Sequence, residues 1–382
     1  MSLVVFPFKE ENPEVLLTSV RIALAHPQVK EVLCVGASED HCFRSVSAAI
    51  PELSREYGKR VAVIVQERLG ELRPGKGDGM NTGLKYFLEE TEHQRIHFYD
   101  ADIVSFSEEW ITKAEEAADE GYQVVRHYFP RSSTDAMITW MVTRTGFALL
   151  WPRSALPWIE QPLGGELLLT REAAEKLFAD PRVRRQSDWG IDTLYTFAMV
   201  AHGLSIAEIY IDAGKLHKLY GALTDLKTML IECFSAVQGL KGEAVPEGTM
   251  HHIEYPGPVR QEMKERIGYD FERTLWLLRE NWTDRQVELL ALFPREVREG
   301  LLTSRQYPRF SFMDEDAWAE VYRVLLAHFD ARDADWAELL FKLWIARVLQ
   351  YTTAVALRGY DYAMYHLHRM VARYVHRALV GA

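Results

Sequence analysis

Cysteine, basic charge and long apolar runs are all scarce in this sequence. Its 382 residues include only 3 cysteines, none in a CxxC pair, which argues against a disulfide framework and indicates free thiols in a reducing compartment. No apolar run approaches the ~18 to 20 residues that a bilayer-spanning helix needs. Residues 1–8 lack the basic start of a signal peptide. We therefore expect a cytoplasmic protein with no membrane partner.

The charge balance is acidic. Lys and Arg number 44 and Asp and Glu number 55, which leaves a net charge of -11 with neutral histidine. Such a chain repels phosphate backbones, so nucleic acid is not expected as a partner. An anionic ligand must then meet a local group of cations or a bound metal. The 48% of hydrophobic residues can still build one large or two ordinary domains.

The first half of the chain alternates β-rich and helical patterns. The β-rich runs lie at residues 3–8, 31–35, 61–65, 97–99 and 123–127. Amphipathic helical patterns separate the first four runs, and two helices have clear starts, at Asn12-Pro13-Glu14 and Ser38-Glu39-Asp40. This order predicts an α/β fold with βαβ units and a mainly parallel sheet flanked by helices.

Long helical periods without a convincing strand follow residue 220. We expect a catalytic domain over residues 1–220 and a mostly helical C-terminal domain over 221–382, joined by a flexible connection at about 239–258, where Gly and Pro break regular structure. His251-His252 and the tryptophans at helical spacing are more typical of core or subunit contacts than of a second site. Apolar helix faces tend to be buried between subunits, which predicts a homo-oligomer.

Two aspartates end the fourth β-rich run. Asp100 and Asp102 follow the apolar residues 96–99, and ligands of open α/β sheets bind beyond the carboxyl ends of strands. Hard divalent cations prefer carboxylate oxygens, and a metal there would neutralise a diphosphate. Alone, this short pattern fits a solvated strand end with helix-capping aspartates equally well.

A lysine and glycine segment, Lys76-Gly77-Asp78-Gly79-Met80-Asn81-Thr82-Gly83, lies between the third and fourth runs. We expect a glycine-broken loop that brings N–H groups and the Lys76 cation close to phosphate. An ordinary flexible loop without a ligand would have the same sequence pattern. With Lys9 and Glu11 after the first run and the Asp-X-Asp, the order of these motifs resembles the GT-A glycosyltransferases over residues 3–220.

The GT-A resemblance implies roles for later segments. Residues 161–171 resemble the glycine-containing segment near donor sugar and acceptor, although a hairpin remains an alternative. Residues 188–192 resemble an acidic helix start that places a carboxylate at the reaction centre, with Asp192 preferred to Asp188. The alternative is that these acids only stabilise the helix N-terminus through its dipole. A late histidine, His217, resembles an additional metal ligand, for which imidazole suits Mn better than Mg.

Arg131 precedes an expected helix that contains Thr139. A guanidinium beside the free N–H groups of a helix start suits a carboxylate, which suggests a small anionic acceptor. A surface arginine before a capped helix is the alternative.

The Phe-Pro-Phe-Lys-Glu-Glu-Asn start, the Tyr-Asp-Ala-Asp motif, the length and the helical C-terminal region resemble the mannosylglycerate synthase family. This resemblance implies transfer of mannose from GDP-mannose to D-glycerate with retention, giving α-mannosylglycerate, a compatible solute. It implies Arg131, Ala136 and Thr139 at the glycerate, and a divalent metal, Mg or Mn, on Asp102 and His217. It implies a nucleotide-sugar site formed by Pro7, Phe8, Lys9, Glu11, Val35, Gln66, Lys76, Asp100, Ala101, Leu163, Asp192, Lys218 and Tyr220.

The mechanism and two rival functions stay open at this point. Asp192, Asp100 and Lys76 are the expected catalytic residues. A front-face reaction, in which the departing phosphate oxygen takes the acceptor proton, is favoured over a double displacement with Asp192 as nucleophile. A sugar-phosphate nucleotidyltransferase normally has a glycine-rich loop after its first strand, where this sequence has none. A non-catalytic nucleotide-sugar-binding protein is the other alternative.

Overall fold

The protein forms two compact units. The structure, a computed structural model, describes residues 1–216 and 222–381. The first unit comprises Met1–Pro130, Ile159–Lys218 and Ala244–Pro258, and the second comprises Arg131–Trp158, Leu219–Glu243 and Val259–Ala382. The division predicted from the sequence, at residue 220, is coarser than this one and stays a prediction.

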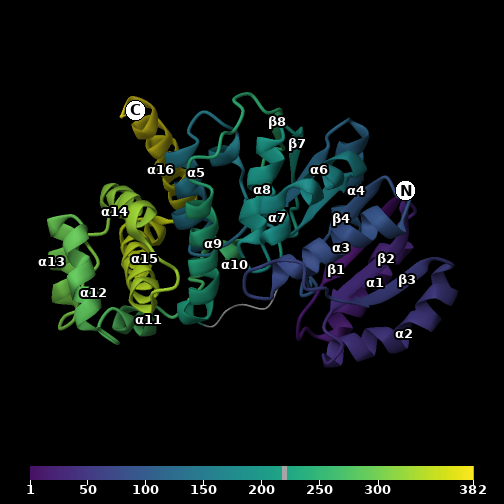
Figure 1. Cartoon of the computed structure of the whole chain (residues 1–382), viewed down its shortest axis with the longest axis horizontal. Helices are drawn as coiled ribbons and strands as arrows, with labels where there is room; N and C mark the ends of the chain where they lie inside the picture. Colours follow the sequence, from purple (N-terminus) through teal and green to yellow (C-terminus); the bar gives the residue numbers. More distant parts are fainter. Residues whose placement is uncertain (217–221, 382) are drawn as a thin grey trace. The chain divides into compact units, whose positions relative to one another are not determined.

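The first unit is built on one mixed sheet. Its strands are β1 Ser2–Pro7, β2 Val29–Gly36, β3 Arg60–Val65, β4 Arg95–Phe98, β5 Val124–Tyr128, β6 Leu167–Thr170, β7 Ile206–Tyr210 and β8 His251–Ile253. They lie in the order β3-β2-β1-β4-β6-β5-β7-β8 (Figure 1). Only β6 runs antiparallel to its neighbours, β4 and β5, in the described sheet. The predicted α/β fold with a mainly parallel sheet is confirmed.

Helices pack along this sheet. They are α1 Pro13–Ala25, α2 His41–Tyr57, α3 Lys76–Glu90, α4 Glu108–Asp119, α6 Arg171–Ala179, α7 Pro181–Arg185 and α8 Ile191–Ala201. Asn12 Oδ1 accepts from Glu14 N at 2.9 Å, and Asp40 Oδ1 accepts from Cys42 N at 2.8 Å. Both predicted helix starts are therefore confirmed, and each cap satisfies an N–H group that the first turn leaves free.

The loop predicted at residues 76–83 is wrong, because helix α3 already begins at Lys76. Its glycines serve close packing instead. A Cβ atom on Gly77 would lie 2.5 Å from Gln186 O, and one on Gly83 would lie 2.8 Å from a methyl group of Val5. Sequence reasoning took glycine as a helix breaker, but burial against neighbouring backbone outweighs its conformational cost of roughly 1 kcal/mol per residue.

The expectation of no strand after residue 220 is also wrong. Strand β8 lies inside the segment predicted as a flexible connection and pairs in parallel with β7. Its three residues are too few to show an alternating pattern. The hairpin alternative for residues 161–171 is not seen either, since β6 there pairs with β4 and β5.

The second unit is helical. It contains a π-helical turn at Thr139–Arg144, α5 Thr145–Leu150, α9 Lys227–Gly239, α10 Gln261–Lys264, α11 Phe271–Leu277, α12 Asp284–Leu289, α13 Arg295–Ser304, α14 Glu315–His328, α15 Ala334–Ala354 and α16 Tyr360–Val380. Trp318, Trp336 and Trp344 are buried, as the core interpretation of the tryptophans predicted, whereas Trp276 is 43% exposed. Trp318 Nε1 donates to Met141 O at 2.8 Å.

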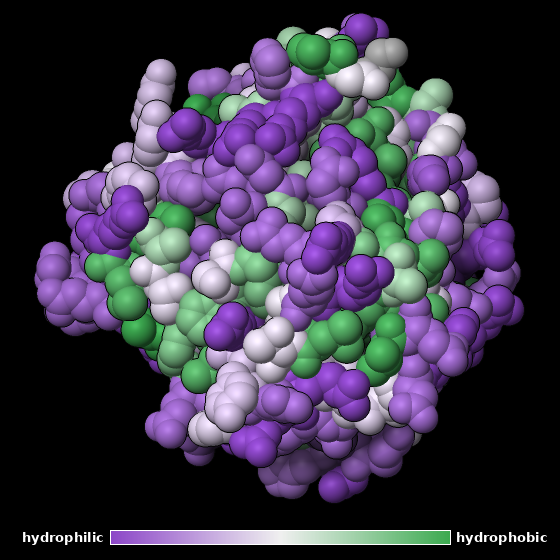
Figure 2. Space-filling view, turned by 90° about the vertical axis from the view of Figure 1, so that its left-hand side faces the viewer, coloured by the Kyte–Doolittle hydropathy of each residue, from purple (hydrophilic) through white to green (hydrophobic). Residues whose placement is uncertain are grey.

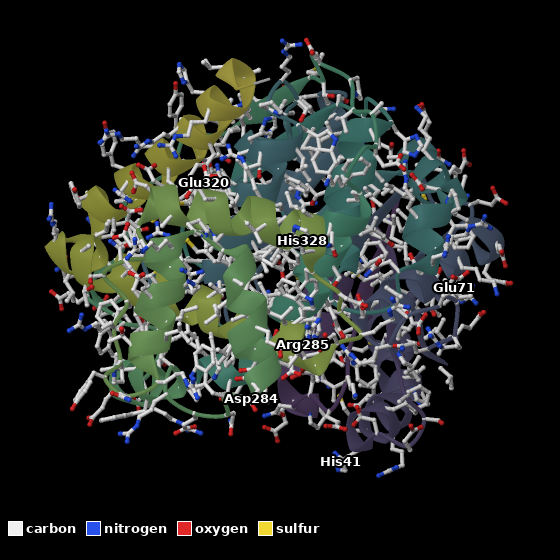
Figure 3. The ribbon with its side chains drawn as sticks, turned by 60° about the vertical axis from the view of Figure 1, so that its left-hand side comes forward. His41, Glu71, Asp284, Arg285, Glu320 and His328 are labelled. Atoms are coloured by element: carbon white, nitrogen blue, oxygen red, sulfur yellow. The ribbon has the colours of Figure 1, made fainter. Side chains whose placement is uncertain are left out.

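The surface of the helical unit alternates apolar and polar side chains. Figure 2 shows apolar patches that charged and polar residues separate. Glu320 and His328 stand exposed on α14 (Figure 3). Among the helices of the described residues, none combines the length and apolar character that crossing a membrane requires. The homo-oligomer and the cytoplasmic location stay predictions.

Candidate active site

The carboxyl ends of strands β1 to β4 meet at one edge of the sheet, because these strands are parallel. Backbone hydrogen bonds continue beyond the strands, from Gln66 N to Gly36 O at 2.8 Å and from Tyr99 N to Val5 O at 3.1 Å. A Cβ atom on Gly79 would lie 3.1 Å from Gln66 Oε1 and 3.3 Å from Pro7 Cβ. Pro7 and Gln66, both predicted at the nucleotide sugar, thus lie beside the first turn of α3.

Two residues predicted at the nucleotide are buried in the core. Val35 is fully buried, and Phe8, 5% exposed, lays its ring over Gly36. A Cβ atom on Gly36 would lie 2.3 Å from the Phe8 ring, so this contact needs glycine. Of the other residues predicted at this strand end, Lys9 is exposed and Pro7 and Glu11 are half-buried, so a ligand can reach these side chains.

Lys76 joins two of the predicted carboxylates. As the first residue of α3, it places Nζ 3.1 Å from Asp100 Oδ1, just after β4, and 3.1 Å from Asp192 Oδ2, in the first turn of α8. The Lys76 side chain is 12% exposed and that of Asp192 is 1% exposed. The structure therefore brings together the three residues predicted as catalytic.

Asp188, the second choice for that role, has a structural task. Its Oδ1 accepts from Gly190 N at 2.8 Å and from Gln186 Nε2 at 2.5 Å, at the start of α8. Asp192 is thus the carboxylate of this segment that faces Lys76.

Lys215 and Glu166 complete the cluster, and sequence reasoning missed both. Lys215 Nζ lies 2.5 Å from Asp100 Oδ2 and 2.6 Å from Glu166 Oε1. Glu166 is fully buried. Glu166 lies in the segment 161–171 that the sequence analysis singled out, whereas Lys215 lies in no such segment. The signal that could have found both is electrostatic, because buried carboxylates at one edge require cations.

The cluster shifts the pKa values of its carboxylates in opposite directions, down for Asp100 and up for Asp192. Burial alone would raise the pKa of Asp100, but Lys215 and Lys76 hold it well below its usual range. For Asp192, burial raises the pKa, although Lys76 opposes this. Burial likewise opposes the charge of Lys76, yet Asp100 and Asp192 raise its pKa. Asp100 is thus firmly ionised at neutral pH, and both lysines keep their positive charge.

A glycine turn, defined as residues 160–166, lies against this cluster. A Cβ atom on Gly165 would lie 2.5 Å from Lys76 Nζ and 2.8 Å from Asp100 Oδ1. A side chain at that position would therefore displace the ion pair. Leu163, predicted at the donor sugar, is half-buried in the same turn.

The residues beside Asp100 suit a divalent cation in their chemistry. Asp102 is half-buried and Ala101 buried, directly after Asp100, and two further carboxylate oxygens, Glu166 Oε2 and Asp192 Oδ1, are buried without a hydrogen-bond partner. Hard oxygens of this kind fit Mg or Mn. Within residues 1–216 and 222–381, no group of three or more His, Cys, Asp or Glu side chains is arranged to hold a metal. His217, Lys218 and Tyr220 lie outside the described residues.

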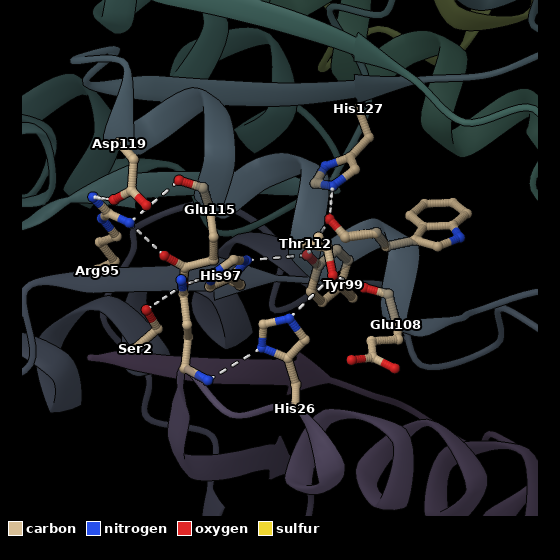
Figure 4. A network of polar contacts seen from close by, with 12 residues as sticks. Ser2, His26, Arg95, His97, Tyr99, Glu108, Thr112, Glu115, Asp119 and His127 are labelled. Atoms are coloured by element: carbon tan, nitrogen blue, oxygen red, sulfur yellow. Dashed lines mark hydrogen bonds and ion pairs between the residues drawn. The ribbon is translucent and has the colours of Figure 1, made fainter.

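A buried polar network supports β4, the strand that precedes Asp100. On β4, His97 lies 2.9 Å from Glu115 Oε1 through Nε2 and 3.0 Å from the Tyr99 hydroxyl through Nδ1 (Figure 4). Arg95 Nη1 lies 2.5 Å from Glu115 Oε2, and the Ser2 hydroxyl also donates to Glu115. Glu115 of α4 therefore ties the helix to two neighbouring strands.

The predicted acceptor residues belong to the second unit. Arg131 Nη1 lies 3.4 Å from Asp135 Oδ2. Ala136 has φ of 56°, an uncommon conformation for a residue with a side chain, and Thr139 opens the π-helical turn. Such backbone strain is enriched at functional sites. The role of these residues stays a prediction.

Comparisons with known proteins identify the family. The family model described as "Mannosylglycerate synthase, GT domain" matches residues 2–239, and "Mannosylglycerate synthase C-terminal domain" matches residues 263–371. The solved structure of glucosyl-3-phosphoglycerate synthase from Mycobacterium tuberculosis with Mn2+, UDP and glucosyl-3-phosphoglycerate is similar at 21% identity and a TM-score of 0.49, covering 65% of this chain and 81% of that one.

Two curated relatives match over nearly the whole chain. Mannosylglycerate synthase from Rhodothermus marinus is 64% identical over 378 residues, covering 99% of this chain and 95% of the relative. Mannosylglycerate synthase from Selaginella moellendorffii is 57% identical over 382 residues, covering 99% and 90%. The predicted resemblance is thereby confirmed, and the chain is a glycosyltransferase that belongs to the mannosylglycerate synthase family.

Proposed function

We propose that this protein transfers mannose from GDP-mannose to D-glycerate, with retention at the anomeric carbon, and so makes α-mannosylglycerate. The observation that carries the proposal is the cluster of Lys76, Asp100 and Asp192 at the carboxyl edge of the sheet. A net charge of -11 would repel a nucleotide diphosphate from most of the surface. Lys76 and Lys215 supply the local cations that such a donor requires.

Each residue of the cluster has a distinct task in this proposal. Lys76 binds the diphosphate and keeps Asp192 oriented. Asp192 Oδ1, buried and without a hydrogen-bond partner, accepts a hydrogen bond from a hydroxyl of the donor sugar or of the acceptor. A divalent metal, Mg or Mn, on Asp102 and His217 would supply further positive charge for the diphosphate as the glycosidic bond breaks.

The environment of Asp192 supports a front-face reaction. Attack on the anomeric carbon would turn the Asp192 carboxylate into a neutral ester and remove the negative charge that its Oδ2 places 3.1 Å from Lys76 Nζ, in a site that solvent barely reaches. A hydrogen-bonding role keeps this ion pair intact. In the front-face route the departing phosphate oxygen takes the proton of the acceptor hydroxyl, and retention follows without a covalent intermediate.

Arg131, Ala136 and Thr139 are proposed to bind the glycerate. The guanidinium of Arg131 suits a carboxylate in charge and geometry. A homo-oligomer and a cytoplasmic location belong to the same proposal, since a compatible solute acts inside the cell that makes it.

The test is product formation from GDP-mannose and D-glycerate with Mg or Mn, with the anomeric configuration of the product read by NMR. We expect α-mannosylglycerate. A β-linked product would refute retention, and transfer from another nucleotide sugar alone would refute GDP-mannose as the donor. GTP and mannose 1-phosphate should release no pyrophosphate.

A further inference from the structure

Buried side chains hold the glycine turn from behind. Arg126 Nη2, on β5, donates to Gln161 O at 2.8 Å and to Gly164 O at 2.9 Å. Thr196 Oγ1, on α8, donates to Pro162 O at 2.7 Å. Arg126 is 1% exposed and Thr196 fully buried. Three backbone carbonyls of the turn are thus held by two side chains that are buried from solvent.

Glu208 fixes the beginning of the same turn. This residue of β7 is fully buried, and its two carboxylate oxygens accept from Glu160 N at 2.9 and 3.1 Å. His251 of β8 lies 2.8 Å from Glu208 Oε2 through Nε2. The short strand β8 therefore contributes to this arrangement, since it brings the His251 imidazole to the Glu208 carboxylate.

Charged groups are costly to bury, and stability alone is a poor reason for keeping them. Burial lowers the pKa of Arg126, while the negative charges of Glu208 and Asp192 oppose this. Its Nε has no hydrogen-bond partner. Apolar residues of similar size often stabilise such a position at least as well. What Arg126 adds is a rigid, planar guanidinium whose Nη2 donates to two carbonyls of one turn and so defines its shape.

The held backbone reaches the reactive groups directly. Gly165 leaves so little room beside Lys76 and Asp100 that a Cβ atom there would lie 2.5 Å from Lys76 Nζ. The next residue, Glu166, binds Lys215. A small shift of the turn would therefore move both lysine contacts, and catalytic geometry tolerates displacements of only about 0.5 Å.

We propose that Arg126, Thr196 and Glu208 are positioning residues, which hold the glycine turn so that its backbone and Leu163 face the sugar of the donor. The sugar as ligand rests on the proposed function. The restraint on the turn rests on geometry alone.

The test compares Thr196→Val, which removes the hydroxyl donor at nearly constant volume, with Thr196→Ser, which keeps it. In the full-length protein, Thr196→Val should speed amide hydrogen exchange in the glycine turn about five- to tenfold, as expected for one lost hydrogen bond. The KM for GDP-mannose should rise by a similar factor, the affinity for GDP should fall less than this, and the KM for D-glycerate should stay unchanged. Thr196→Ser should restore both readouts.

Thr274→Val in α11 is the matched control. Thr274 is 2% exposed and donates to Asp270 O at 2.6 Å, so its loss disturbs a buried hydroxyl without touching the turn. Equal exchange in the two Thr196 variants, or a loss of GDP affinity that parallels the loss of GDP-mannose affinity, would overturn the proposal. If the wild-type protein does not use GDP-mannose, the proposed function fails while the exchange comparison still decides the restraint.

Discussion

Lys215 Nζ lies 2.5 Å from Asp100 Oδ2, while Lys76 Nζ lies 3.1 Å from the other oxygen of the same carboxylate. Asp100 thus holds one ammonium group on each side. Both lysines also contact a second buried acid, Glu166 for Lys215 and Asp192 for Lys76. The chain of charges is continuous from α3 through the end of β4 to Glu166, so the loss of one member leaves another buried charge without a partner.

Lys215→Met should destabilise the protein by about 3 to 5 kcal/mol at neutral pH, since it strands the fully buried Glu166 carboxylate. Adding Glu166→Gln should recover part of this loss, because an amide carries no charge to strand. Urea unfolding of the single and double variants measures both effects. Simple additivity of the two single substitutions would show that the pair is not coupled.

Gly165→Ala should lower kcat at least tenfold and lower the free energy of unfolding by less than Lys215→Met does, because the ion pair shifts but is not lost. The new methyl group would come within 2.5 Å of Lys76 Nζ, the mobile end of a flexible side chain, so the protein yields by moving the ion pair rather than by unfolding. Gly239→Ala is the control, because nothing lies within 4 Å of a Cβ atom there. Wild-type kcat in Gly165→Ala would contradict the importance of the Lys76 position.

Much of the fold could be predicted from the sequence, because most local signals agree with the tertiary structure. Apolar runs with helical patterns between them gave the order of β1 to β5, and Asn12 and Asp40 cap the helices that they were expected to start. Strand β8 was missed because its three residues depend on β7 for their conformation. Helix α3 was read as a loop because its glycines were taken for flexibility rather than for close packing.

For the site, sequence motifs predicted residues that follow strands but not those that the tertiary fold brings to them. Asp100 and Asp192 carried recognisable patterns. Lys215 and Arg126 did not, because nothing local shows that a lysine after β7 reaches a carboxylate after β4, or that an arginine within a strand holds a distant turn. Family membership decides between the functions left open, since it makes the chain a glycosyltransferase rather than a nucleotidyltransferase or a non-catalytic binding protein.

Glu115 should make stability depend on pH in the acidic range. Hydrogen bonds from His97 and other donors overcome its burial and lower its pKa from 4.5 to about 2. Because the folded pKa is the lower one, Glu115 contributes fully above pH 4.5, by about 3 kcal/mol, and the contribution disappears as the pH falls toward 2.

Glu115→Gln should therefore destabilise the protein near pH 7 and flatten its stability profile between pH 4.5 and 2. Urea unfolding across this range is the measurement. Glu116→Gln, at the exposed neighbouring position of α4, should leave the profile as in the wild type. Parallel profiles for wild type and Glu115→Gln would show that Glu115 does not set the acid sensitivity.

Metal removal should abolish transfer if Asp102 holds the proposed cation. We expect no product in EDTA and recovery with Mg or Mn. Asp102→Asn should weaken Mn binding at least tenfold, because a neutral amide is a poorer ligand for a hard cation, and electron paramagnetic resonance can measure this without turnover. Undiminished activity in EDTA would contradict the metal proposal. Loss of activity in Asp102→Asn with unchanged Mn binding would show that Asp102 is not a ligand of the metal.

Arg131→Met should raise the KM for D-glycerate at least tenfold and leave the affinity for GDP unchanged. The guanidinium is the group expected to meet the acceptor carboxylate, and a charge-assisted hydrogen bond contributes roughly 1.5 to 3 kcal/mol. Glycerol, which lacks the carboxylate, separates this role from a structural one. If Arg131 reads the carboxylate, the variant should use glycerol as poorly as the wild type does, and only the preference for glycerate should fall. An equal loss with both acceptors would show instead that Arg131 maintains the fold of the segment that contains Asp135 and Ala136.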